Sequence, residues 1–386
     1  MPRLQHSPGG SLRSCPRSAA GRGRRARRRL KRTVAGVGAL AGAALLAVRP
    51  AGTAGGMVEP AGPDCNAALV ERAAWLMGTT LRATVCAPSR DVGVAAIEAA
   101  FAAVRETEAR LSTWRPDSEL SRLNAAAPGA WIELSPATAA LLAEARSLSV
   151  RTGGAFDPAV GAAIDAWDLR GTGRTPGPRE VEAAREHAGP VAWELDPAAG
   201  RARRRPGVRL DAGAFGKGAG LRYASVDLQT AGLAWAVLDF GGQLLMWSRD
   251  ARTRWPVAVA DPRDRDRPVA ILHVGPGSVA TTAASERWVE VDGERVGHVI
   301  DPRTARPVPP WGSVTVVAAD PVTADALSTA LFVMGRRDAL AWSATTRAAA
   351  FLVEADGSRL GFHSSPKLDA LASVQPVPNH RKDFRR

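Results

Sequence analysis

Short runs of alternating apolar and polar residues fill the second half of the chain, with turn-favouring residues between them. Such runs are typical of strands that bury one face. They predict strands at 76–85, 191–195, 208–210, 235–239, 243–247, 256–260, 269–274, 288–291, 295–300, 314–317 and 349–354. Asp292-Gly293 predicts a tight hairpin between two of these strands.

Apolar residues spaced three and four positions apart predict helices between the strands. The expected helices cover 91–111, 135–152, 179–187 and 337–345, with two more after a glycine-rich turn at 211–220 and from Asp320 onward. Asp320 suits the N-cap and Pro321 the first helical position. Clustered antiparallel strands with helices at intervals predict an α+β fold rather than a doubly wound sheet.

The positive charge of the chain is concentrated at its start. The formal net charge is +13, but residues 1–32 hold ten arginines, one lysine and no acidic residue, and Arg49 adds one more positive charge. The remainder is therefore close to neutral, at about +1. A nucleic-acid-binding domain would carry its positive charge on the folded part, so we exclude this function.

The basic start has the form of an export signal. Arg24–Arg32 precede sixteen uncharged residues, Thr33–Val48, that are rich in alanine, glycine, leucine and valine. A basic region followed by a short apolar segment predicts export to the extracytoplasmic side, in the periplasm or cell envelope. The Arg28-Arg29-Leu30-Lys31 core resembles a twin-arginine signal. An uncleaved anchor, with membrane contact through the leader, is the alternative.

Composition divides the chain into four parts. Residues 1–54 form the leader, 55–75 a linker, 76–363 the folded domain and 364–386 a loosely ordered tail. Two cysteines, Cys65 and Cys86, follow the leader. An oxidising compartment permits a disulfide between them, although the sequence alone does not decide whether they pair.

Two stretches near the end of the chain carry candidate chemistry. His298 lies three residues before Asp301, and Pro302 introduces a bend that could bring both side chains to one side. In the helix expected after Asp320, Asp325 and Thr329 share a face with Ser328 beside them. Oxygen ligands without cysteine or histidine favour a hard cation such as Mg²⁺. A hydrogen-bonded structural histidine and a solvated helix face are the simpler interpretations.

The glycine-rich turn at 211–220 contains Lys217 and leads into a helix. Such a turn can offer backbone N–H groups and a lysine charge to a phosphate. It is not a Walker A loop, because Asp211 rather than glycine stands six positions before Lys217 and no Ser or Thr follows the lysine. Nor does the turn match the G-x-G-x-x-G fingerprint. A glycine-rich helix start that packs against a sheet is equally compatible.

Together these motifs resemble the FAD:protein FMN transferases, the ApbE family, from Met77 to Phe362. The matching pieces, in order, are M-G-T-T at Met77, L-S-T-W at Leu111, S-E-L-S-R-L-N at Ser118, G-A-F-D-P at Gly154, L-D-A-G-A-F-G-K-G at Leu210, D-F-G-G at Asp239, V-A-T-T at Val279, H-V-I-D-P-R-T at His298 and A-D-A-L-S-T at Ala324. The resemblance implies a single α+β domain that binds FAD between its sheet and helices.

The resemblance also implies roles for individual residues. The FAD site would be lined by Met77, Trp114, Ala155, Phe156, Asp157, Asp211, Lys217 and Ile300. The Mg²⁺ site would be formed by Asp325, Ser328, Thr329 and the backbone carbonyl of Ala214, and the reacting centre by His298 and Asp301. Family members transfer the FMN half of FAD to a Thr or Ser hydroxyl of an acceptor flavoprotein, forming a phosphoester.

The sequence departs from the family pattern at two positions where glycine is usual, Ala283 and Ala305. If both line turns with positive φ, each alanine costs about 1 kcal/mol. Two alternative functions remain open at this point. One is a Mg²⁺-dependent FAD pyrophosphatase that releases FMN and AMP, and the other is an exported flavin-binding protein without catalytic activity.

Overall fold

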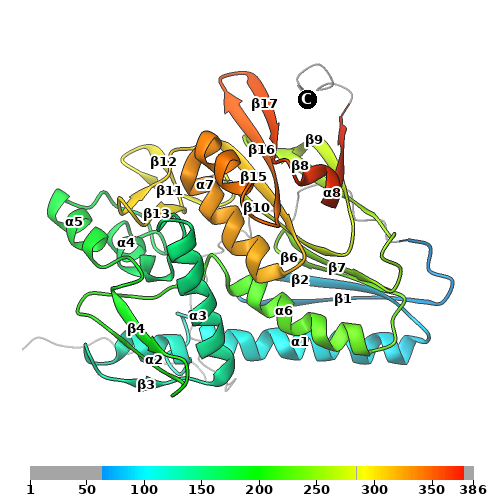
Figure 1. The fold of residues 1–386 in the computed structure, drawn as a ribbon, viewed down its shortest axis with the longest axis horizontal. Helices are drawn as coiled ribbons and strands as arrows, with labels where there is room; N and C mark the ends of the chain where they lie inside the picture. Colours follow the sequence, from blue (N-terminus) through cyan, green and yellow to red (C-terminus); the bar gives the residue numbers. More distant parts are fainter. Residues whose placement is uncertain (1–62, 284, 378–386) are drawn as a thin grey trace, which may run out of the picture. The chain divides into compact units, whose positions relative to one another are not determined.

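An eight-stranded antiparallel sheet forms the centre of the part of the chain that the computed structural model describes, residues 63–283 and 285–377 (Figure 1). In spatial order its strands are β1 (Ala68–Leu76), β2 (Thr79–Ala87), β6 (Trp235–Phe240), β7 (Gln243–Ser248), β10 (Gly277–Ala283), β15 (Gly312–Ala318), β16 (Ala349–Asp356) and β17 (Arg359–Ser364). Strand β15 is buried at every position. Both of its faces are therefore covered, and its two polar side chains, Ser313 and Thr315, are buried together with its valines.

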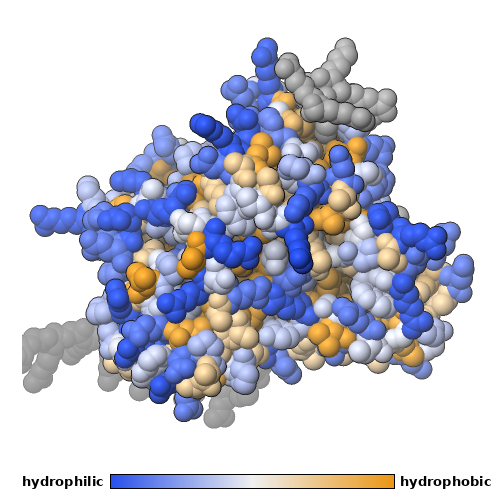
Figure 2. Space-filling view, viewed as in Figure 1, coloured by the Kyte–Doolittle hydropathy of each residue, from blue (hydrophilic) through white to orange (hydrophobic). Residues whose placement is uncertain are grey.

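Helices cover one face of this sheet and a smaller sheet covers the other. On the first face, α1 (Arg90–Leu111) contacts α6 (Gly216–Thr230), which contacts α7 (Pro321–Ser343) (Figure 1). The smaller sheet consists of β8 (Trp255–Asp261), β9 (Asp264–Val274) and β18 (Ala372–Pro376), and it shares a hydrophobic core with the second face. The outer surface in the same view is mainly hydrophilic, with apolar residues in small separate groups (Figure 2).

Helix α7 begins where the sequence predicts. The Asp320 side chain accepts a hydrogen bond from the Thr323 backbone N–H at 2.8 Å, and Pro321 occupies the first turn. The two helices predicted after Asp320 and at 337–345 form one element with a kink at Gly335, whose φ is +75°. Only glycine adopts that conformation readily inside a helix, so a local break in the backbone joins the two predicted segments.

The remaining elements lie in two groups. The first comprises α2 (Glu119–Ala125), β3 (Ile132–Glu133), α3 (Pro136–Arg151), the 3₁₀ turn η1 (Pro158–Val160), α4 (Gly161–Ala166), α5 (Pro178–Glu186), β4 (Trp193–Asp196) and β5 (Arg201–Arg204). The second comprises the hairpins β11 (Trp288–Val291) with β12 (Glu294–Gly297) and β13 (Ile300–Asp301) with β14 (Arg306–Pro307). The short helix α8 (Leu368–Leu371) lies apart from both groups, against β18 and β16. The predicted Asp292-Gly293 hairpin is confirmed.

The predicted α+β architecture with antiparallel strands is confirmed, but several boundaries were wrong. The strand expected at 76–85 is two strands, β1 and β2, which pair across a turn at Met77 and Gly78 with φ of +46° and +73°. Residues 68–75 of the expected linker therefore belong to the sheet. Likewise α8 and β18 lie in the expected tail, where β18 pairs with β9. Residues 208–210, which the structure describes, do not form the expected strand.

Cys65 and Cys86 form a disulfide that ties the segment before β1 to β2. The predicted leader, residues 1–54, lies outside the described residues. Among the helices that the structure does describe, none is both long and apolar enough to cross a bilayer.

Candidate functional site

The starts of α6 and α7 bring Lys217 and Asp325 together. The Lys217 ammonium lies 3.0 Å from Asp325 Oδ1, and the Gly218 backbone N–H donates to Asp325 Oδ2 at 2.9 Å. A Cβ on Gly218 would lie 2.4 Å from the Pro321 carbonyl oxygen, so glycine is required where the two helices touch. The Asp325 side chain is 6% exposed and that of Lys217 is 29% exposed, so the carboxylate is enclosed while the lysine still reaches the surface.

Hydroxyl groups extend this cluster. Ser328 Oγ donates to the Asp325 carbonyl at 2.9 Å and lies 2.8 Å from Thr282 Oγ1. Thr329 is half-buried one residue further along α7, and Ala214 is half-buried in the turn before α6. The atoms that these residues could offer to a metal ion are all oxygens, the ligand type that Mg²⁺ prefers. The described residues contain no group of three His, Cys, Asp or Glu side chains placed to hold a metal. A cation here would therefore rely on one carboxylate, neutral oxygens, water and substrate phosphates, which fits the usual coordination of Mg²⁺.

His298 lies between β12 and β13, and its ring is held by a backbone carbonyl. His298 Nδ1 lies 3.0 Å from the Arg287 carbonyl oxygen. A carbonyl oxygen only accepts, so this contact assigns the proton to Nδ1 and leaves Nε2 as an acceptor. Burial lowers the pKa of His298 to about 4; the Arg287 carbonyl opposes this shift, and the positive charges of Arg287 and Lys217 reinforce it. At neutral pH the ring is an uncharged base in the field of Lys217.

Asp301 has a different partner from the one expected. Its carboxylate accepts from the Arg303 backbone N–H and from the Arg303 guanidinium, each at 2.9 Å. The carbonyl of Arg287, rather than Asp301, orients the His298 ring. The bend at Pro302 thus pairs Asp301 with a later residue of its own turn. Ile300 is buried against the cluster that contains Trp167 and Ala305.

Glu286 belongs to the same electrostatic neighbourhood, although the sequence analysis missed it. Burial raises the pKa of Glu286 to about 7; the positive charges of Arg265, Lys217 and Arg287 oppose this shift, and the negative charge of Asp325 reinforces it. Its side chain is half-buried at the end of the segment that follows β10. A glutamate in a polar stretch before a hairpin gives no sequence signal, because only the fold brings it near Lys217.

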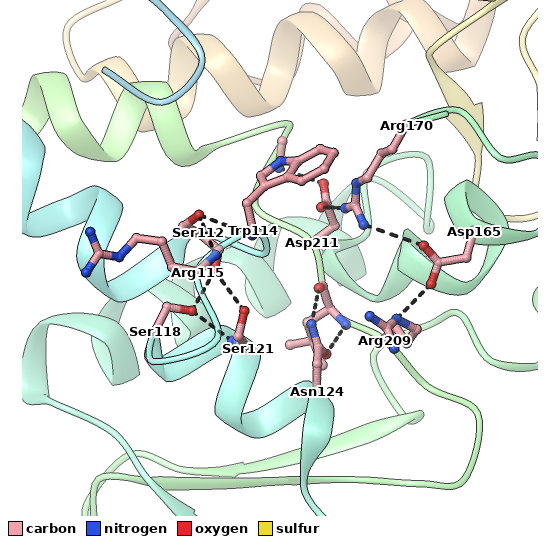
Figure 3. A network of polar contacts seen from close by, with 12 residues as sticks. Ser112, Trp114, Arg115, Ser118, Ser121, Asn124, Asp165, Arg170, Arg209 and Asp211 are labelled. Atoms are coloured by element: carbon pink, nitrogen blue, oxygen red, sulfur yellow. Dashed lines mark hydrogen bonds and ion pairs between the residues drawn. The ribbon is translucent and has the colours of Figure 1, made fainter. Parts of the chain in front are cut away.

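Trp114 and Asp211 form a second polar group with a residue that was not predicted, Arg170 (Figure 3). The Arg170 guanidinium lies over the Trp114 ring and donates to Asp211. Asp211 Oδ1 also accepts from the Gly213 backbone N–H at 2.8 Å. This hydrogen bond fixes the turn that leads to Lys217, so the two groups are connected through one short segment of chain.

The other residues expected to line the flavin site are more enclosed. Ala155 and Phe156 are buried in the main core, where Phe156 packs edge-on against Phe215. Asp157 accepts from Ser149 Oγ and the Ala159 backbone N–H, and burial raises the pKa of its carboxyl group against these hydrogen bonds. The side chains of these residues face the protein, so any contact with a ligand would come mainly from the backbone.

Met77 occupies the turn between β1 and β2. Its backbone N–H donates to Glu108 Oε1 at 3.0 Å. Its side chain reaches α6, because a Cβ placed on Gly220 would lie 3.6 Å from Met77 Cε. The turn therefore contacts α1 at Glu108 and α6 at Gly220, and Gly220 lies three residues beyond Lys217.

A model of the ApbE family matches residues 77–352. The chain belongs to the ApbE family. It is 34% identical over 287 residues to the FAD:protein FMN transferase of Treponema pallidum, across 68% of this chain and 78% of that protein. It is 38% identical over 233 residues to the FAD:protein FMN transferase of Rhodobacter capsulatus, across 58% of this chain but only 44% of that longer protein.

Solved structures of ApbE proteins agree with the fold. The ApbE protein of Thermotoga maritima superposes with a TM-score of 0.69 at 26% identity, and the match covers 83% of this chain and 100% of the Thermotoga chain. The apo flavinyl transferase ApbE of Pseudomonas stutzeri gives a TM-score of 0.69 at 26% identity, covering 79% and 96% of the two chains.

The two departures from the ApbE pattern have different structural consequences. Ala305 has φ of +52°, in the left-handed region, so the expected backbone cost applies there. Ala283 lies in the extended backbone of β10, so the expectation of a turn was wrong at that position. The Ala305 carbonyl accepts from Trp167 Nε1 at 2.8 Å, which fixes the turn after Asp301.

Proposed function

We propose that the chain is a Mg²⁺-dependent FAD:protein FMN transferase that attaches FMN to a Thr or Ser hydroxyl of a target flavoprotein through a phosphoester bond. The observation that carries the proposal is the imidazole of His298, which the Arg287 carbonyl holds with Nε2 as an acceptor. Burial lowers the pKa of His298 to about 4, the positive charges of Arg287 and Lys217 add to this shift, and Lys217 is itself paired with Asp325 at 3.0 Å. A base beside a lysine and a carboxylate-based cation site suits phosphoryl transfer. The curated relatives named above carry the same activity in their names.

In the proposed reaction, His298 Nε2 accepts the proton of the acceptor hydroxyl. The hydroxyl oxygen forms a bond to the phosphorus of the FMN half, and the bond from that phosphorus to the bridging oxygen breaks. AMP leaves with the electron pair of the broken bond. The Arg287 carbonyl keeps Nε2 as the acceptor by holding the proton on Nδ1. Lys217 offsets negative charge on the pyrophosphate.

Asp325, Ser328, Thr329 and the Ala214 carbonyl are the residues that would hold Mg²⁺. When bound, the cation would supply positive charge to the phosphate oxygens. The Lys217 ammonium occupies one Asp325 oxygen, at 3.0 Å. A cation held by that oxygen would compete with Lys217, and Lys217 would then be available to offset charge on the substrate phosphates.

The test is incubation of the protein with FAD, Mg²⁺ and a candidate acceptor domain, followed by the mass of the acceptor. A mass gain of one FMN with equimolar AMP supports transfer. Free FMN and AMP with an unmodified acceptor would instead indicate a pyrophosphatase. Binding of FAD without turnover would indicate a flavin-binding protein. Replacing each Thr and Ser of the acceptor by Ala identifies the modified hydroxyl.

We also propose that the protein acts on the extracytoplasmic side of the membrane. The basic leader with its apolar segment and the Cys65–Cys86 disulfide support this location, because disulfides persist in oxidising compartments. Fractionation of cells that express the full chain, with and without residues 1–54, tests the proposal. Recovery of both forms in the cytoplasm would contradict it.

A further inference from the structure

The Trp114 side chain is exposed although its backbone is fixed. Ser112 Oγ accepts from the backbone N–H groups of Trp114 and Arg115, and Ser118 and Ser121 donate to the Ser112 carbonyl. The Trp114 side chain nevertheless projects from this loop with 74% of its surface exposed. An exposed indole can adopt several rotamers, so something else must decide which way the ring faces.

Arg170 provides the one ring contact recorded for Trp114 in the part of the chain that the structure describes. Its Cζ lies 5.8 Å from the centroid of the indole, within the range of a cation–π contact (Figure 3). This distance leaves no room for another planar ring between the guanidinium and the indole, since two stacking distances amount to about 7 Å. The guanidinium therefore closes one face of Trp114, and the opposite face is left for a ligand.

Arg170 is itself held firmly. It donates to Asp211 and lies 3.5 Å from Asp165 Oδ1, while Asp165 Oδ2 also accepts from Arg209 at 2.7 Å. The loop that carries Arg170 is fixed by the hydrogen bond from Trp167 to the Ala305 carbonyl. The Arg170 side chain is only 26% exposed. A guanidinium held in this way by carboxylates costs little further ordering when it supports a neighbouring ring.

We propose that Arg170 is a positioning residue that sets the orientation of Trp114, so that the free face of the indole stacks on the isoalloxazine ring of FAD. This inference rests on the proposed function, because that function makes FAD the ligand. The inference adds that Arg170 contributes to affinity only for ligands that carry the flavin ring. A ligand with the same diphosphate but no flavin does not benefit from the orientation of Trp114.

The first test compares FAD with ADP. Arg170→Ala should weaken FAD binding about 5- to 20-fold, as the cation–π contact and the preordered ring are lost. The affinity for ADP, measured by calorimetry, should be unchanged. Arg170→Lys should recover part of the FAD affinity, because an ammonium retains the charge but not the planar fork. Arg201→Ala is the matched control: it removes an arginine that lies 4.7 Å from the ring centroid of a different tryptophan, Trp131, and it should leave FAD binding unchanged.

The second test asks whether Arg170 acts through Trp114. In a double-mutant cycle, Arg170→Ala should change FAD affinity less than twofold once Trp114 is Ala. The rate of FMN transfer at saturating FAD should stay near the wild-type value, because only the binding of the ring is affected. An equal loss of FAD and ADP affinity would overturn the inference, as would an unchanged FAD affinity or a full effect in the Trp114→Ala background. Failure of the wild-type protein to bind FAD would instead overturn the proposed function itself.

Discussion

Burial and neighbouring charge decide which residues of the site can exchange protons near neutral pH. His298 and Glu286 both lie near Lys217 and Arg287, yet burial lowers the pKa of the histidine to about 4 and raises that of the glutamate to about 7. In both cases burial disfavours the charged form. The histidine is therefore a neutral base at pH 7, and the glutamate changes its charge close to that pH.

Replacing His298 should affect the chemical step rather than FAD binding. If Nε2 accepts the hydroxyl proton, His298→Ala should lower the single-turnover rate of FMN transfer about 10²- to 10⁴-fold, with FAD affinity nearly unchanged. Fluorescence quenching of FAD, alongside single-turnover assays, separates the two effects. His273→Ala serves as the control, because it removes an imidazole on β9 whose Nε2 lies 3.0 Å from Gln375 Oε1 on β18. A variant with weak FAD binding and a normal rate at saturation would show that His298 is structural.

The pH profile gives an independent measure of the same residue. The unprotonated form of His298 is lost only as pH falls through its pKa of about 4, so the acid limb due to this residue should lie near 4 rather than near 6.5. A limb near pH 7 that disappears in Glu286→Gln would belong to Glu286, whose pKa is about 7. A limb near 6.5 that only His298 substitutions remove would contradict the environment described for the imidazole.

Asp325 should control the magnesium requirement. It contributes the only carboxylate of the proposed metal ligands, so Asp325→Asn leaves neutral oxygens alone for a hard cation. We expect loss of turnover at ordinary Mg²⁺ concentrations, with partial recovery as Mg²⁺ is raised. Ser328→Ala should have a smaller effect, because a neutral ligand is lost. Titration of activity and of direct Mg²⁺ binding measures both variants. A normal Mg²⁺ dependence in Asp325→Asn would place the metal elsewhere.

At the scale of the elements, local signals were predictable and long-range pairings were not. Asp320 with Pro321 marks the start of α7, and Asp292-Gly293 marks a hairpin, because a few adjacent residues determine each. The Met77-Gly78 turn was missed because methionine is not a turn-forming residue, and its φ of +46° is imposed by the surrounding strands and α1.

In the candidate site, too, local sequence signals were predictable and long-range contacts were not. The glycine-rich turn and the helix face singled out Lys217 and Asp325 separately, but their contact spans 108 positions and only the packing of α6 against α7 creates it. Arg170 and Glu286 carried no motif at all. Their positions depend on loops whose paths are set by distant anchors, such as the bond from Trp167 to the Ala305 carbonyl. Periodicity and turn signals contain no information about such contacts.

The turn after Asp301 offers a test of backbone strain with an internal control. Ala305→Gly and Ala283→Gly each remove one buried methyl group, but only Ala305 has positive φ, at +52°. We expect the Ala305→Gly protein to be more stable than the Ala283→Gly protein by about 1–2 kcal/mol, the cost of the left-handed conformation for alanine. Urea denaturation of both variants measures the difference. Equal stabilities would show that the turn carries no such strain.

At the scale of the whole molecule, the described fold extends further at both ends than the sequence predicts. Strand β1 adds an edge to the central sheet, and β18 adds one to the smaller sheet. The Cys65–Cys86 disulfide fastens the segment before β1 to the end of β2. The folded part therefore starts before residue 76, and any shortened protein must keep Cys65 if it is to keep the crosslink.

Removing residues 1–54 should leave a soluble protein that binds FAD, because all described strands and helices lie between Ala68 and Pro376. Removing residues 1–66 also keeps β1 but deletes Cys65. A disulfide that closes a loop with a sequence separation of 21 stabilises a fold by about 3 kcal/mol, chiefly by restricting the unfolded chain. The shorter protein should thus unfold at lower urea concentration, by about that free energy. Reductant should lower the stability of the longer protein to that of the shorter one and leave the shorter one unchanged.

If the protein without residues 1–54 were insoluble or failed to bind FAD, the leader would have to contribute to the fold. If both proteins were equally stable under oxidising conditions, the disulfide would have no role in holding β1 on the sheet.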